Sequence, residues 1–194
     1  MLMGNRSELS HPIDHERFSD GSMMRSPLSI ALQLPDTINV RAMLRGDDPE
    51  TEDIRSILSD LCRTVAEQGQ FVVSGFGQDR WPVDVGTDLA IFLEQLPNVL
   101  RAVKAGAATE IDFYEQGIER KIEFSPAGDV YQATCISQTE WRPDPAVEQV
   151  GRAVLEGMLM GVQERVVKLI EEIAPDLAEH DWVWRWRSNT AIEQ

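Results

Sequence analysis

Few residues of this chain have the types and spacing that metal binding or catalysis requires. His11 and His15 are four residues apart, which on a helix would place two imidazoles on one face, as in many zinc sites. Pro12 lies between them and no third ligand type is organised nearby, so we favour a solvated tail. The third histidine, His180, stands beside Asp181 after the last long helical pattern, where capping or exposure is its ordinary explanation. We predict no metal site.

Signals for a cofactor are equally weak. A buried-strand pattern at 71–74 is followed by Gly75-Phe76-Gly77, as at the start of a dinucleotide-binding loop. Arg80 occupies the third glycine position and no helix begins at once, so the match is poor. Cys62 and Cys135 lack the spacing of a zinc or redox pair, and reduced buried thiols are the default. We predict no cofactor.

The abundance of acidic residues leaves general acid–base chemistry open without a motif. With 33 Asp and Glu in 194 residues, some carboxylates must lie close together, as the pairs in glycosidases do. The same abundance prevents any one pair from being chosen, so we assign no catalytic residue. A small enzyme or ligand-binding domain, with a pocket near the loop at 75–84, is therefore kept as an alternative.

Net charge is the most unusual property of the chain. Eighteen Lys and Arg against 33 Asp and Glu leave a charge of −15, with a pI near 4.5. Nucleic acid and anionic membranes would be repelled, so neither is an expected partner. A basic protein would be attracted and its association accelerated. Simple solubility is the commoner explanation of such a charge.

Hydrophobic periodicity predicts a flexible arm at 1–26 followed by a single α+β domain over 27–194. The first expected elements are a hairpin of strands at 28–34 and 38–42, a helix that Thr51 caps, that has an apolar stripe over 54–65 and that ends at Gly69, and a strand at 71–74. A helix follows that opens at Thr87 and closes at Gly106, with a kink or break at Pro97. The last are a meander of strands at 111–114, 118–124 and 130–137 and a long helix from Ala146 to Ile173 capped by Asp144. Together they predict a mostly antiparallel sheet with a C-terminal β-meander, helices packed on one face, and a long C-terminal helix.

The solvent side of the predicted meander is the candidate binding surface. Alternation places Asp112 and Tyr114 on one strand beside Glu119, Lys121 and Glu123 on the next. An acidic surface with a rigid aromatic at its centre has the composition that captures a basic protein. An ordinary solvated sheet face is the competing interpretation.

Two groups of tryptophans complete the candidate residues. Trp81, in a polar loop, is either a lid over the core or a contact residue beside this surface; the lid is favoured because tryptophan usually buries most of its area. Trp182, Trp184 and Trp186 alternate with Val183 and two arginines near the C-terminus. They could stack bases or line a groove. We favour a C-terminal plug whose arginines pair with surface acids.

Two resemblances follow from these segments. FLEQLP at 92–97 and EIDFYEQGIER at 110–120 resemble a family of small uncharacterised bacterial α+β proteins over about residues 71–175, which implies no activity or catalytic residue. The size, acidity and α+β pattern are similar to immunity proteins of bacterial toxin systems. That second resemblance implies a protein that binds and neutralises a toxin domain.

We therefore expect a cytoplasmic immunity- or inhibitor-type protein whose partner is basic. The N-terminus lacks the apolar core of a secretory signal, and no stretch approaches the ~18 consecutive apolar residues of a membrane span. An adaptor that forms a homodimer through the long helix at 146–173 is the third alternative.

Overall fold

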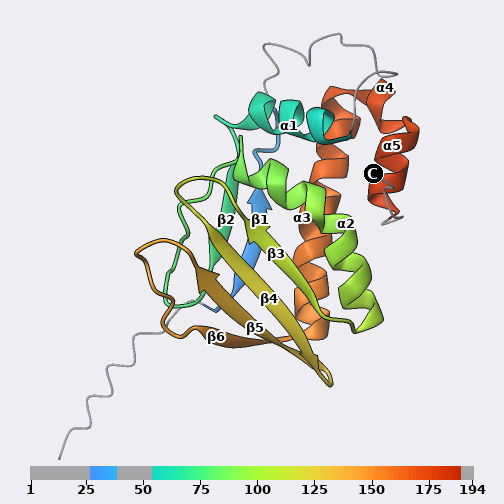
Figure 1. The fold of residues 1–194 in the computed structure, drawn as a ribbon. Helices are drawn as coiled ribbons and strands as arrows, with labels where there is room; N and C mark the ends of the chain where they lie inside the picture. The colour runs from blue at the N-terminus through green and yellow to red at the C-terminus, as the bar shows by residue number, and fades with distance from the viewer. Residues whose placement is uncertain (1–26, 39–53, 189–194) are drawn as a thin grey trace, which may run out of the picture.

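A computed structural model describes residues 27–38 and 54–188 and shows an α+β fold with two antiparallel sheets (Figure 1). In chain order the elements are β1 (Ser29–Gln33), α1 (Ile54–Val65), β2 (Gln70–Ser74), α2 (Asp88–Ala105), β3 (Thr109–Phe113), β4 (Arg120–Ala127), β5 (Val130–Ser137), β6 (Val147–Gly151), α3 (Arg152–Ile173), α4 (Pro175–Ala178) and α5 (Asp181–Arg187). The arm at 1–26, the Thr51 cap and nearly all of the second hairpin strand lie outside the described residues. The predicted fold class is confirmed.

The smaller sheet joins segments that are distant in sequence. β1 pairs antiparallel with β2, from Ser29 opposite Ser74 to Gln33 opposite Gln70. The alternation read from the sequence is confirmed at β1, where Ile30 and Leu32 point into the core. We predicted a local hairpin partner for β1, whereas the partner found among the described residues is the strand that follows α1.

The larger sheet is the predicted meander with one strand more. Its order is β3-β4-β5-β6, with every neighbouring pair antiparallel. Residues 147–151 form the fourth strand, so the prediction that the long helix begins at Ala146 with Asp144 as cap is wrong; α3 begins at Arg152. Val147, Val150 and Val154 have the spacing of one helix face, but β-branched residues also suit a strand. Residues 147–151 form a strand because they pair with β5, with Val150 opposite Tyr131.

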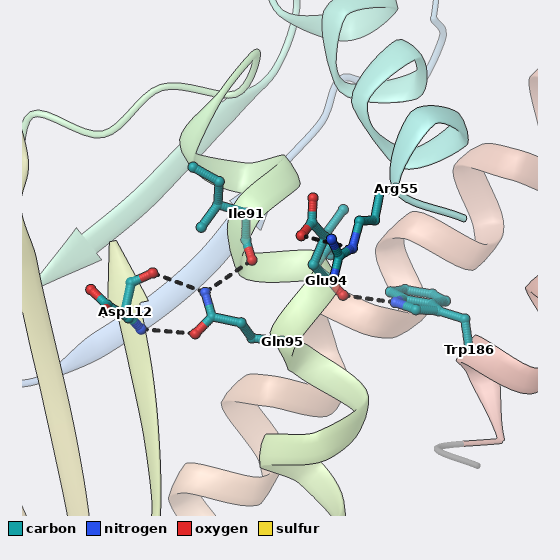
Figure 2. Close-up of polar contacts among 7 residues, drawn as sticks. Arg55, Ile91, Glu94, Gln95, Asp112 and Trp186 are labelled. Atoms are coloured by element: carbon teal, nitrogen blue, oxygen red, sulfur yellow. Dashed lines mark hydrogen bonds and ion pairs between the residues drawn. The ribbon is translucent and has the colours of Figure 1, made fainter. Parts of the chain in front are cut away.

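Helix α2 is one continuous helix despite Pro97 in its interior, and Figure 1 shows its axis changing direction partway along. It ends as predicted at Gly106, whose left-handed backbone (φ 67°) closes the last turn. Proline has no N–H, so the carbonyl of Leu93 loses its usual helical donor. Instead the indole Nε1 of Trp186 donates to Leu93 O at 2.8 Å (Figure 2).

The other side of α2 is tied to the edge of the larger sheet. Gln95 donates from Nε2 to the carbonyl of Asp112 and accepts from the Asp112 N–H at Oε1, both at 2.9 Å (Figure 2). The amide side chain thereby occupies the hydrogen-bonding groups that a further strand would use at this point of β3. Edge strands covered in this way resist pairing with another chain.

The C-terminal tryptophans lie on α5 and point in different directions. Trp186 and Val183 are buried, whereas Trp184 is 61% exposed. Arg185 pairs with Asp181 at 2.6 Å, and Arg187 with Glu171 on α3 at 3.9 Å. The predicted plug is confirmed for Trp186. Trp182 and Trp186 are four residues apart and lie on one side of the helix, whereas Trp184 lies on another side, so the three indoles form no shared stacking face.

Candidate protein-binding face and buried arginine

The outer face of the β3–β6 sheet is the surface on which the sequence placed a binding site. The inner face carries two charged residues, Arg120 and Glu148, and otherwise fills the core with Ile111, Phe113, Ile122, Phe124, Tyr131, Ala133, Cys135 and Val150. The outer face consists of the alternate positions Glu110, Asp112, Lys121, Glu123, Ser125, Gln132, Thr134, Ile136, Val147 and Gln149, continued by Tyr114 just beyond β3. In Figure 1 the described helices lie behind this sheet or beside it.

Acidic groups gather on the β3–β4 side of the outer face around one lysine. Lys121 lies 3.2 Å from carboxylate oxygens of both Glu110 and Glu123, and it is opposite Asp112 in the strand register. Hydrogen bonds to the two glutamates raise the pKa of Lys121 above its ordinary value. Two carboxylates thus contact the Lys121 ammonium and a third acidic residue, Asp112, lies opposite Lys121, which leaves this side of the face negative.

Apolar groups lie on the β5–β6 side of the outer face. Ile136 is 39% exposed and faces Lys121 across the strands, and Val147 is 41% exposed one strand farther. Tyr114, 56% exposed, lies at the opposite end of the face just beyond β3, and not at its centre as predicted. Partial burial raises the pKa of Tyr114, and the nearby carboxylate of Glu94 raises it further. Exposed apolar groups beside charged ones form the usual centre and rim of a protein interface.

Glu119 lies at the margin of this face, in the turn before β4. Its backbone has a positive φ of 44°, its N–H donates to Glu115 O, and its carbonyl accepts from Gln138 N. The prediction that Glu119 lies on the same strand as Lys121 and Glu123 is therefore wrong, because β4 begins only at Arg120. The residue opposite Glu123 on β3 is Glu110. The strand begins two residues later than the predicted start at 118, because the turn extends through Glu119.

Trp81 is separate from the outer face. It is fully buried, with ring centroids 5.9 Å from Phe113 and 6.0 Å from Trp141. Its indole N–H donates to the carbonyl of Gly75. Trp81 is a lid on the core, as we favoured, and it does not lie on the surface as a contact residue beside Tyr114.

The two glycines that resemble a dinucleotide loop serve close packing within the protein. Residues 75–77 all have positive φ, at 119°, 57° and 83°. A Cβ at Gly75 would lie 2.8 Å from the Cα of Leu28, and one at Gly77 would lie 1.9 Å from the carbonyl oxygen of Asp144. The carboxylate of Glu148 accepts the N–H groups of Phe76 and Leu28. Backbone of this chain occupies the space that the glycines create.

Arg120 was missed by the sequence analysis. It follows Ile118 and precedes Ile122 at the inward positions of the alternation, and only 4% of it is exposed. Its guanidinium carbon lies 3.7 Å from the ring centroid of Trp141 and 4.8 Å from that of Trp81. The strand period alone could have identified it, because a charged residue at an inward position is rare unless paired.

Asp84 and Asp88 form the most prominent carboxylate pair, at the start of α2. Asp88 Oδ2 accepts from Asp84 N at 2.8 Å, and Asp84 Oδ1 accepts from Thr87 N at 2.7 Å. Burial raises the pKa of Asp88 more than its hydrogen bond lowers it, and Asp84 and Glu115 add to the increase. Both carboxylates are used to hold the helix N-terminus, which is the structural role of such residues.

The raised pKa of Asp88 gives a testable pH dependence. Because the folded pKa exceeds the ordinary value of 3.8, the folded state retains the proton more tightly, and ionisation costs stability as pH rises through the folded pKa. Asp88→Asn removes the charge but can still accept the Asp84 N–H. We expect urea denaturation across a pH series to show the wild type losing stability relative to this variant as pH rises. A difference that does not vary with pH would contradict the prediction.

Comparisons with known proteins add no relative. No family model matches the chain, and neither curated proteins nor solved structures give a match. Within residues 27–38 and 54–188, no three His, Cys, Asp or Glu side chains are grouped to hold a metal ion. None of the described helices has the length and apolar composition to cross a bilayer. The two resemblances read from the sequence stay predictions.

Proposed function

We propose that the chain is a cytoplasmic immunity- or inhibitor-type protein that binds and blocks a basic protein, such as a toxin domain, through the outer face of the β3–β6 sheet. The observation that carries the proposal is the layout of that face. Carboxylates lie on β3 and β4, exposed Ile136 and Val147 lie on β5 and β6, and Tyr114 stands at the margin. Aromatic and apolar anchors hold a partner, while charges orient it.

At the β3 edge, the hydrogen bonds of Gln95 favour binding by side chains of the face over strand addition. Gln95 occupies the backbone groups of Asp112 at the β3 edge, so a partner strand cannot pair there. The net charge of −15 accelerates encounter with a cationic partner and makes the association rate sensitive to salt. A partner rich in Lys and Arg therefore fits this surface.

Dimerisation through the apolar stripe of the long helix receives less support. On α3 the residues Leu155, Leu159, Val162, Val166, Leu169 and Ile170 are all buried inside the described fold. The stripe that we considered as a dimer contact is therefore used by the chain's own core.

Two substitutions on the outer face test the proposal. We expect Tyr114→Ala to weaken partner binding by about 30-fold, since loss of an aromatic hot spot costs about 2 kcal/mol. Glu123→Lys should slow association, because it replaces attraction by repulsion next to Lys121. The partner is first captured on the immobilised wild-type chain at low and at high salt and identified by mass spectrometry. Surface plasmon resonance then gives both rate constants.

Glu164→Lys is the matched control, because Glu164 is exposed on α3, away from the outer face, and the substitution changes net charge equally. It should leave the affinity nearly unchanged. If both charge reversals slow association equally, bulk charge and not the outer face is responsible. Absence of a specific protein partner at either salt concentration would refute the proposed function itself.

A further inference from the structure

Arg120 is a buried cation with one nitrogen, Nε, that no described residue satisfies. Its Nη1 donates to Gln78 Oε1 at 2.7 Å, and that is the only hydrogen bond of its guanidinium to the described residues. Its Nε is buried and has no partner among them. A buried polar group left without a partner is unfavourable, so each such group in a native protein needs an explanation, and a bound ligand is one.

No carboxylate of the described residues forms an ion pair with Arg120. Burial lowers the pKa of the guanidinium from its ordinary value. The two tryptophan rings supply cation–π contacts, which stabilise the charge without satisfying the N–H groups. In a chain with 33 acidic residues, an arginine without a carboxylate partner is a notable exception to the rule that buried charges are paired.

The surroundings come from three separate segments. Gln78 and Trp81 belong to the turn after β2, Arg120 opens β4, and Trp141 lies in the connection between β5 and β6. Trp141 is only half-buried, so the cluster reaches the surface along that ring. The turn and the connection are held together by the bond from Asp144 N to Phe76 O at 3.0 Å.

We propose that the Nε/Nη2 edge of Arg120 binds the carboxylate of a small organic acid, with Trp141 beside the rest of the molecule. Two parallel N–H groups on one edge of a guanidinium match the two oxygens of a carboxylate. A monoanion fits better than a phosphate dianion, because the site is desolvated and the protein is strongly negative. The site is independent of the outer face, and it agrees with the alternative of a ligand site near the 75–84 loop.

The test is an NMR titration of the wild-type protein that follows arginine Nε–H resonances. Acetate and benzoate are the probes. We expect the Arg120 Nε–H resonance to shift and saturate with each, and benzoate to bind more tightly because its ring can contact Trp141. Arg120→Lys, which keeps the charge but not the two-pronged edge, should weaken benzoate binding at least tenfold.

Arg142→Gln is the control, since Arg142 is exposed next to the same tryptophan and bonds to the carbonyls of Thr139 and Trp141. Its binding of benzoate should match that of the wild type. An Arg120 resonance that stays unmoved by both carboxylates refutes the site, even if the lysine variant does not fold. If inorganic phosphate shifts the Arg120 Nε–H resonance as much as the carboxylates do, the site is not specific for carboxylates. If Arg142→Gln weakens benzoate binding as much as Arg120→Lys does, benzoate binds elsewhere.

Discussion

Trp186→Ala should lower the free energy of unfolding by about 3–5 kcal/mol, the usual effect of deleting a large aromatic side chain from a core. Trp186 is fully buried although it lies near the end of the described chain. It also joins helices through hydrogen bonds, since its indole donates to Leu93 O and its carbonyl accepts from Gln163 Nε2. Equilibrium denaturation in guanidinium chloride gives the value. The exposed Trp184 is the control: Trp184→Phe should change stability by less than about 0.5 kcal/mol.

A double-mutant cycle isolates the hydrogen bond from the packing. Trp186→Phe keeps an aromatic ring but leaves the Leu93 carbonyl without a donor, which should cost about 1–3 kcal/mol. Pro97→Ala restores a backbone N–H that can donate to the same carbonyl. The phenylalanine substitution should therefore cost about 1 kcal/mol less in the Pro97→Ala background. Equal costs in both backgrounds would show that the indole bond does not compensate for the proline.

Gly77→Ala is the second substitution with a large expected effect. Its φ of 83° disfavours any side chain, and the new Cβ would lie 1.9 Å from the carbonyl oxygen of Asp144. Left-handed strain contributes about 1–2 kcal/mol, and forced displacement of packed backbone adds about 1–3 kcal/mol. We expect the free energy of unfolding, measured by urea denaturation, to fall by about 3 kcal/mol or more.

Gly128→Ala separates the two causes. Gly128 also has a positive φ, 69°, but a Cβ added there would meet no atom within 4 Å. This variant should therefore lose only the strain, about 1–2 kcal/mol. If the two alanine variants lose the same stability, the close approach of Asp144 is not what requires glycine at position 77. If Gly77→Ala folds, the Arg120 Nε–H resonance should also move, because Gln78 is the next residue.

Local sequence signals determined much of the fold. The helical stripe of α1, the buried strand β2, the left-handed end of α2 at Gly106 and the alternation of β3–β5 depend on periods and turns within a few residues. The sequence also placed Asp112 and Glu123 on the outer face and predicted the exposed Tyr114. These features are readable because alternation along a strand assigns a side chain to one face or the other wherever the strand lies.

Tertiary structure decided what depends on distant partners. The valines of residues 147–151 fit a helix as well as a strand. These residues form a strand because they pair with the edge of β5. Only the folded chain set the Trp186 indole against the Leu93 carbonyl, 93 residues away. Likewise, the strand period assigns Arg120 to the inner face. Only the packing of three segments places its guanidinium against two tryptophan rings, with no ion pair to a carboxylate of the described residues. The acidic charge was determined by composition, whereas the burial of Arg120 away from those acids was determined by the fold.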